Sequence, residues 1–238
     1  MKLLHFEELD STNTYVKNNM HELEDKTVVY TSHQTSGRGR MERKWVDTGA
    51  DNIYMTILLK PSDRIEPVYA NITQYLSVTL CKVLEDFGVE GQIKWPNDVL
   101  VEGRKIAGIL SETSMQGENF MGLALGVGIN LNTTVESLAE IDKPATSLSV
   151  ILGKKIDRET FLKLLLEKFF LLYDRFLKEG FILIKDEYVK RSSFLGKEIS
   201  VNVLGTIHRG VAESITDAGT LVLKKDDEKL TFFIGDIL

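Results

Sequence analysis

Apolar positions along the chain alternate between the period of a strand and the period of a helix. In the stretch Asn52–Leu59 both faces carry apolar side chains, which predicts a central strand covered on each side. The longest helical stripe runs from about Arg158 to Lys178, with Asp157 as its cap and Gly180 at its end. The other elements predicted up to residue 191 are strands at 3–9, 27–33, 99–101, 106–110 and 119–129, helices at about 12–20, 67–87 and 182–191, and a short helix that follows the loop at 144–148 and is ended by Gly153. A chain of 238 residues with this pattern can bury a sizeable core.

The pattern changes after Gly196, where short β-like runs are separated by turns. These runs are Lys197–Val203, Thr206–Ile215, Leu221–Lys224 and Leu230–Ile234. Short strands at this spacing predict a small barrel or a curled sheet. We therefore expect a domain boundary near residues 191–196, with a first domain over 1–191 and a second over 192–238.

The segment from Lys94 to Glu112 has the pattern of a β-hairpin with polar groups around it. Two apolar runs flank the turn Glu102-Gly103-Arg104, and Lys105 opens the second strand. Gly108 lies three residues further on, and a glycine inside a strand often marks the close approach of a ligand or another backbone. A lysine at a glycine-floored apolar cleft suits an anionic ligand. An ordinary hairpin whose charges face water explains the same residues, and the hairpin alone does not decide between the two.

Two other segments could also contact a ligand. Residues 34–45, QTSGRGRMERKW, place glycines among basic residues, and arginine binds phosphate or carboxylate through paired hydrogen bonds. In the strand 119–129, Gly122, Gly126 and Gly128 share one face, which leaves room for a flat group or for a tightly packed helix. Ser11 or Thr12 is expected to cap the first helix.

The composition limits which ligands, nucleophiles and metals can be expected. The net charge is −6, so any anion site must be local, and nothing global attracts nucleic acid or an acidic membrane. Cys81 is the one cysteine, which suits a reducing compartment, and its place in a predicted helix with no histidine nearby in sequence indicates a core or near-core residue rather than a nucleophile. The four histidines are scattered, which disfavours a protein-held metal. No signal-peptide pattern is present, so we expect a cytoplasmic protein.

Five short motifs together resemble those of biotin protein ligases. They are SerThrAsn at 11–13, GlnThrSerGlyArgGlyArg at 34–40, LysTrpProAsnAsp at 94–98, ArgLysIleAlaGlyIleLeu at 104–110 and GlyValGlyIleAsn at 126–130. They follow the order and spacing of that family over essentially the whole chain. The resemblance implies an α+β fold: a mixed β-sheet flanked by helices, as in class II aminoacyl-tRNA synthetases and biotin ligases, followed by a small SH3-like β-barrel.

The resemblance also implies a reaction and its residues. Biotin and ATP would form biotinyl-5′-AMP, and a lysine of a biotin carboxyl carrier protein would then take the biotinyl group. The implied catalytic residues are Lys105, Arg40 and Asp98, with Asp98 as a general base. The implied biotin contacts are Ser11, Thr12, Asn13, Gln34, Arg38, Gly39, Arg40, Lys105 and Gly108. The implied nucleotide contacts are Arg38, Arg40, Trp45, Asn97, Lys105, Asn130 and Arg209, the last in a His-Arg-Gly turn. Mg²⁺ is expected on the ATP phosphates, with no metal ligand assigned to the protein.

Other functions stay open at this point. A lipoate–protein ligase or transferase shares the fold and the acyl-adenylate chemistry, and a non-catalytic sensor of biotin or a nucleotide is a further alternative. Larger members carry an N-terminal DNA-binding domain, whereas here the first catalytic strand is expected at about Leu3, so no DNA binding is expected. A homodimer is left open. One departure from the family pattern is Met41-Glu42, because an acidic residue lowers the local potential of an anion-binding loop.

Overall fold

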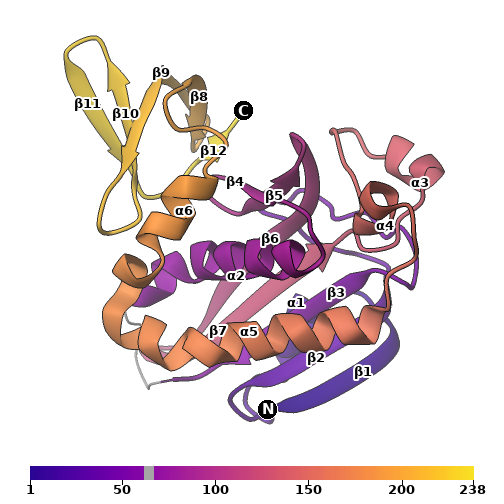
Figure 1. Ribbon diagram of the computed structural model, residues 1–238. Coiled ribbons are helices and arrows are strands. Elements are labelled where there is room, and N and C mark those ends of the chain that lie inside the picture. The colour runs from indigo at the N-terminus through magenta and orange to yellow at the C-terminus, as the bar shows by residue number, and fades with distance from the viewer. Residues whose placement is uncertain (62–66) are drawn as a thin grey trace. The chain divides into compact units, whose positions relative to one another are not determined.

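The computed structural model describes residues 1–61 and 67–238 (Figure 1). The chain divides into two compact units, each built from two separate stretches. The first unit contains Met1–Tyr69 and Arg104–Lys163, and the second contains Ala70–Gly103 and Leu164–Leu238. Within the described residues, no helix combines the length and apolar character required to cross a bilayer.

The first unit is built on a mixed sheet, as predicted. Its strands are β1 (Lys2–Leu9), β2 (Thr27–Gln34), β3 (Ile53–Leu59), β6 (Arg104–Gln116) and β7 (Asn119–Ile129). They lie in the order β1-β2-β3-β7-β6. The β1–β2 pair is parallel, whereas the β2–β3, β3–β7 and β6–β7 pairs are antiparallel. Every residue of β3 is buried, which confirms it as a central strand covered on both faces.

Short helices cover this sheet and close its loops. Helix α1 (Thr12–Asn18) packs Val16 against Val29, Leu58 and Ala124. Helices α3 (Val135–Ala139) and α4 (Leu148–Leu152) follow β7. Ser147 caps α4 by accepting a hydrogen bond from the Val150 N–H (3.3 Å), and Gly153 ends it in the left-handed conformation (φ 65°).

The second unit contains most of the helical residues and the two short strands that lead to the turn at Glu102-Gly103. Its elements are the end of η1 (Pro67–Asn71), α2 (Ile72–Asp86), β4 (Gln92–Lys94), β5 (Asp98–Val101), most of α5 (Arg158–Glu179), η2 (Gly180–Leu183) and α6 (Lys185–Arg191). The helix predicted over 67–87 therefore begins with a 3₁₀ turn. Glu102 and Gly103, which follow β5, both have positive φ (51° and 74°), as a type I′ turn requires.

Aromatic side chains join α2 to α5 in the core of the second unit. The Tyr75 ring stacks on Phe176, with centroids 4.4 Å apart, and meets Phe169 edge-on at 5.1 Å. The Tyr75 hydroxyl donates to the Phe169 carbonyl, and burial raises the pKa of this tyrosine. Because a buried Tyr hydroxyl without a partner would be costly, this bond fixes the register of the two helices.

A second sheet follows the helices. Its strands are β8 (Glu198–Val203), β9 (Thr206–Ile215), β10 (Leu221–Lys225), β11 (Glu228–Phe232) and β12 (Asp236–Ile237). The order is β11-β10-β9-β8-β12, and all pairs are antiparallel. The turn at 218–219 is bound to the start of α2: Asn71 donates to the Ala218 carbonyl (3.0 Å) and Gln74 to the Gly219 carbonyl (2.8 Å). The predicted strands are thus present, and β12 adds to them.

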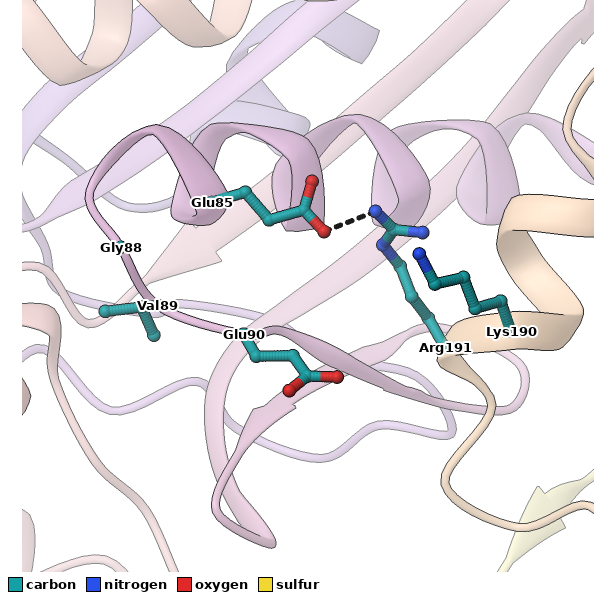
Figure 2. Close-up of a pocket in the computed structure, with 6 residues that line it drawn as sticks. All are labelled: Glu85, Gly88, Val89, Glu90, Lys190 and Arg191. Carbon is teal, nitrogen blue, oxygen red and sulfur yellow. Dashed lines mark hydrogen bonds and ion pairs between the residues drawn. The ribbon is translucent and has the colours of Figure 1, made fainter.

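The second unit also contains a pocket of about 300 Å³ (Figure 2). Its lining residues are Glu85, Gly88, Val89, Glu90, Lys190 and Arg191. The Arg191 side chain is 6% exposed, and its guanidinium donates to Glu85 (2.5 Å) and to Glu187. Glu85 and Glu187 already neutralise Arg191. We therefore interpret these ion pairs as a link between α2 and α6 rather than as a site for an anion.

We expect Arg191→Ala to lower the free energy of unfolding by about 1–3 kcal/mol, since it removes a buried partner and a packed aliphatic stem. We expect less than the roughly 3–5 kcal/mol typical of breaking a buried pair, because Glu85 and Glu187 are 46% and 38% exposed. Urea denaturation followed by circular dichroism measures the change. Lys190→Ala, in the same pocket, is the matched control with a change within about 0.5 kcal/mol. Equal midpoints for the two variants would contradict the structural role of Arg191.

Candidate active site

The basic segment 34–45 forms a small hairpin attached to the first sheet. The Gly39 N–H donates to the Arg43 carbonyl (2.7 Å), and the Trp45 N–H donates to the Gly37 carbonyl (2.9 Å). At the tip, Met41 and Glu42 have positive φ (52° and 59°), the conformations of a type I′ turn. The non-basic pair that departs from the family pattern therefore reverses the chain, and both residues are exposed.

A polar network fixes the far end of this hairpin. Asp47 Oδ2 accepts from the Gln34 N–H (3.1 Å) and lies 3.0 Å from His33 Nδ1. Asp47 Oδ1 accepts from the Tyr54 hydroxyl (3.0 Å) and the Gly49 N–H (2.8 Å). Since strands β2 and β3 supply most of these donors, the hairpin leaves and rejoins the sheet at defined points.

The Trp45 ring lies directly on two glycines of the sheet. Gly108 of β6 and Gly128 of β7 are opposite each other in the strand register. A Cβ at Gly128 would be 2.3 Å from the Trp45 ring, and a Cβ at Gly108 would be 2.8 Å from it. The glycines thus accommodate a flat group, as their spacing predicts, and in this structure that group is the protein's own indole. The indole N–H is buried and has no hydrogen-bond partner among the residues that the structure describes, so an acceptor on a ligand would satisfy it.

Lys105 is held beside this indole by backbone bonds. Its N–H donates to the Pro144 carbonyl (2.9 Å), and its carbonyl accepts from the Thr146 N–H (2.9 Å). The ammonium lies 5.4 Å from the centroid of the Trp45 ring, within the range of a cation–π contact. Asn130 is 3% exposed, and its N–H donates to the carbonyl of Ile106, the residue after Lys105 (2.8 Å). The structure therefore brings Lys105, Trp45, Gly108 and Asn130 together.

The predicted biotin contacts at the start of α1 are also clustered. Ser11, Thr12 and Asn13 are each 3% exposed, and the Thr12 N–H donates to Gln34 Oε1 (2.9 Å). Ser11 occupies the capping position of α1, but its side chain makes no capping bond. Asn13 lies on Gly126, where a Cβ would be 2.1 Å from its Oδ1. A second glycine of β7 therefore makes room for a polar side chain.

Two polar residues absent from the predicted set orient Asn13. The Thr56 hydroxyl of β3 donates to Asn13 Oδ1 (2.6 Å), and Asn13 Nδ2 donates to Glu112 Oε2 (2.9 Å). Glu112 Oε1 also accepts from Lys17 (2.8 Å) and from Arg38. The period of two along β6 places Glu112 on the face of Gly108, and Thr56 interrupts an apolar run, so both signals were present in the sequence.

The environment of Glu112 favours its ionised form. Burial alone would raise the pKa of this carboxyl, but hydrogen bonds from Lys17 and Asn13 and the charges of Arg38 and Lys17 hold it below its ordinary value. An ionised carboxylate only accepts hydrogen bonds, so the amide nitrogen of Asn13 must face it. The orientation of Asn13 is therefore set by charge as well as by shape.

Other predicted residues belong to the second unit. Asp98 opens β5 opposite Lys94 of β4, and Asn97 lies in the turn between these strands. Arg209 is exposed and pairs with Ser200 inside strand β9, so its expected place in a turn was wrong. The histidine and glycine beside it do not end a strand because β9 continues to Ile215. The roles of these residues stay predictions.

Cys81 is a core residue, as predicted. Its side chain is fully buried in α2, and burial raises the pKa of the thiol to about 12. A thiol whose pKa is raised in this way is protonated near neutral pH, which agrees with a core residue rather than a nucleophile. In the part of the chain that the structure describes, no group of three or more His, Cys, Asp or Glu residues is placed to hold a metal.

Known proteins match this chain over most of its length. Residues 5–130 match the profile described as "Biotin/lipoate A/B protein ligase family". The chain is 32% identical to the Biotin--[acetyl-CoA-carboxylase] ligase of Paracoccus denitrificans over 224 residues, which cover 90% of this chain and 91% of that protein. It is 30% identical to the Bifunctional ligase/repressor BirA of Bacillus subtilis (strain 168) over 213 residues, 89% of this chain. The chain spans 65% of the length of that relative.

A solved structure matches the fold. The biotin protein ligase of Aquifex aeolicus, in complex with biotin and ATP, superposes with a TM-score of 0.84 over 100% of this chain and 97% of that chain. The sequence identity is 24%, so this likeness concerns the fold. A mixed sheet flanked by helices and followed by an antiparallel sheet is therefore common to both.

We expect Gly128→Ala to displace the Trp45 ring, because the new Cβ would lie 2.3 Å from ring atoms. The tryptophan emission should shift to the red and become more accessible to iodide. Gly39→Ala is the matched control, since its Cβ would meet no atom closer than 3.4 Å. The shift should vanish in a Trp45→Phe background, where only the buried Trp95 emits. An unchanged emission spectrum in Gly128→Ala would contradict the contact between the Trp45 indole and β7.

Proposed function

Because the chain belongs to the biotin/lipoate A/B protein ligase family, we propose that it is a biotin–protein ligase that uses ATP to attach biotin to a carrier protein. The acceptor is a specific lysine of a biotin carboxyl carrier protein of a biotin-dependent carboxylase. The observation that carries this proposal is the grouping of Lys105, Trp45 and the basic hairpin on the glycine face of β6 and β7. A cation beside an aromatic platform suits an acid that must meet a nucleotide phosphate.

In the first step, a carboxylate oxygen of biotin attacks the α-phosphorus of ATP. The bond to pyrophosphate breaks, and biotinyl-5′-AMP forms. Two anions approach one another, so cations placed beforehand lower the barrier. Lys105 lies nearest the carboxylate and the α-phosphate, and Arg38 and Arg40 approach from the hairpin. These side chains neutralise charge, and no covalent bond to the protein is required.

In the second step, the amine of the acceptor lysine attacks the acyl carbon of the mixed anhydride. An amide forms, AMP leaves, and the amine loses a proton to Asp98 as general base. Biotin itself contacts the buried residues Ser11, Thr12, Asn13 and Gln34, which offer amide and hydroxyl groups. Arg38, Gly39, Arg40, Lys105 and Gly108 complete the biotin contacts. The nucleotide contacts Arg38, Arg40, Trp45, Asn97, Lys105, Asn130 and Arg209.

Mg²⁺ enters in this proposal as part of the ATP substrate. No metal ligand is assigned to the protein in this proposal. We further propose that the antiparallel sheet from β8 to β12 is the SH3-like barrel of the second domain, 192–238, beside a catalytic domain over 1–191. A free, buried Cys81 agrees with a cytoplasmic location.

Lipoate attachment is the competing function, because the family description includes lipoate ligases. Both acids would be adenylated in the same way, so they are distinguished by their head groups. We expect biotin to raise the melting temperature, since a ligand that binds only the folded state stabilises it, and lipoate to leave it unchanged. Differential scanning fluorimetry with each acid in the presence of ATP measures this. Stabilisation by lipoate and not by biotin would reverse the assignment.

We expect Lys105→Ala to lower biotin-dependent adenylation by roughly 10²–10³-fold, because a cation at the reacting groups is lost. The melting temperature should stay close to that of the wild type, since the backbone bonds of residue 105 do not involve its side chain. Formation of biotinyl-5′-AMP, measured by single-turnover chromatography, gives the rate. Lys154→Ala, at an exposed position, is the matched control. A rate near that of the control would remove Lys105 from the mechanism.

A further inference from the structure

We propose that Glu112 is a positioning residue that fastens the basic hairpin to the biotin-binding end of α1 through Arg38. The proposal rests on the function proposed above. It assigns to Glu112 no contact with the reacting atoms. Its effect is on where Arg38 and the backbone of the hairpin lie when biotin binds.

Three elements converge on this one carboxylate. Glu112 belongs to β6, Asn13 and Lys17 belong to α1, and Arg38 belongs to the hairpin. Both carboxylate oxygens are used: Oε2 accepts from Asn13 (2.9 Å), and Oε1 accepts from Lys17 (2.8 Å) and Arg38. A single side chain therefore ties together segments that are 74 and 99 residues apart in sequence from it.

The exposure of the partners indicates which contact matters for ligand binding. Glu112 is 17% exposed, whereas Arg38 is 43% exposed and belongs to the basic hairpin, whose ends are held by the Asp47 network and by the contact of Trp45 with β6 and β7. Asn13 is also held by a hydrogen bond from Thr56 and by its contact with Gly126. Loss of the carboxylate should therefore free the hairpin more than it disturbs α1.

The partly buried site makes this ion pair stronger than an exposed one. The low exposure of Glu112 limits screening by water, and the Lys17 ammonium keeps the carboxylate ionised beside Arg38. Arginine can give the carboxylate directed hydrogen bonds from a planar group, so the pair restricts orientation as well as distance. Such a restriction would hold the basic hairpin in position before biotin binds.

Glu112→Gln is the informative variant because it keeps the size of the side chain and an acceptor for Asn13 but removes the charge that holds Arg38. Steady-state kinetics of biotin-dependent ATP–pyrophosphate exchange should show KM for biotin raised about tenfold, with kcat changed less than about twofold. A residue needed only for folding would instead lower the melting temperature and leave KM for biotin unchanged. Glu118→Gln, in the exposed turn between β6 and β7, is the matched control.

A second background tests the route through Arg38. In Arg38→Met, KM for biotin is expected to rise already, and adding Glu112→Gln should change it less than about twofold further, because the two residues form one pair. Glu112→Asp should recover part of the loss. If KM for biotin in Glu112→Gln equals the wild-type value, falls below it, or rises equally in the Arg38→Met background, the positioning role is wrong. If the wild type itself shows no biotin-dependent exchange, the proposed function fails instead.

Discussion

The contact between the Trp45 ring and the glycine face of β6 and β7 is the constraint on which the site depends. Any side chain at Gly108 or Gly128 would occupy the space of the ring, so these strands can carry an aromatic group only because they lack a Cβ there. The ring in turn provides the surface beside which Lys105 lies. The same arrangement recurs at Gly126, where Asn13 approaches the sheet. The glycines thus set how closely Trp45 and Asn13 approach the sheet.

The second constraint is charge, because the positive charge for anionic substrates has to come from a local group of residues. The chain carries a net charge of −6, although the proposed substrates are a carboxylate and a nucleotide triphosphate. The basic hairpin concentrates positive charge at one place, and its acidic residue Glu42 is directed into the exposed turn at the tip. The carboxylate that contacts Arg38 is Glu112, from the sheet beneath. An acidic protein can therefore bind anions without an overall attractive field.

Much of the fold follows from local patterns in the sequence. The all-apolar stretch of β3, the stripe of α5 and the turn signal at Glu102-Gly103 each identify an element through its own neighbours. Strand β12 contains only Asp236 and Ile237, which is too short for an alternating pattern to be visible. Arg209 was expected in a turn only through the family resemblance, whereas the local pattern predicted a β-like run over Thr206–Ile215, which β9 matches.

The sequence predicted which residues belong to the candidate site better than it predicted how these residues contact one another. The motifs identify Lys105, Trp45 and the buried residues of α1, but no local pattern shows that Trp45 fills the glycine face. That contact joins residues far apart in the chain, and it depends on where the hairpin folds back. The network of Thr56, Asn13 and Glu112 escaped prediction for the same reason. Side chains that meet through tertiary structure leave only weak signals in a single sequence.

Transfer of biotin to an acceptor tests the central claim most directly. The protein would be incubated with biotin, ATP, Mg²⁺ and a purified biotin carboxyl carrier domain, and the intact mass of the carrier would be measured. The account predicts a mass gain of one biotinyl group per carrier that requires ATP and is abolished when the acceptor lysine is replaced. A carrier that stays unmodified, while a lipoyl domain gains a lipoyl group under the same conditions, would contradict it.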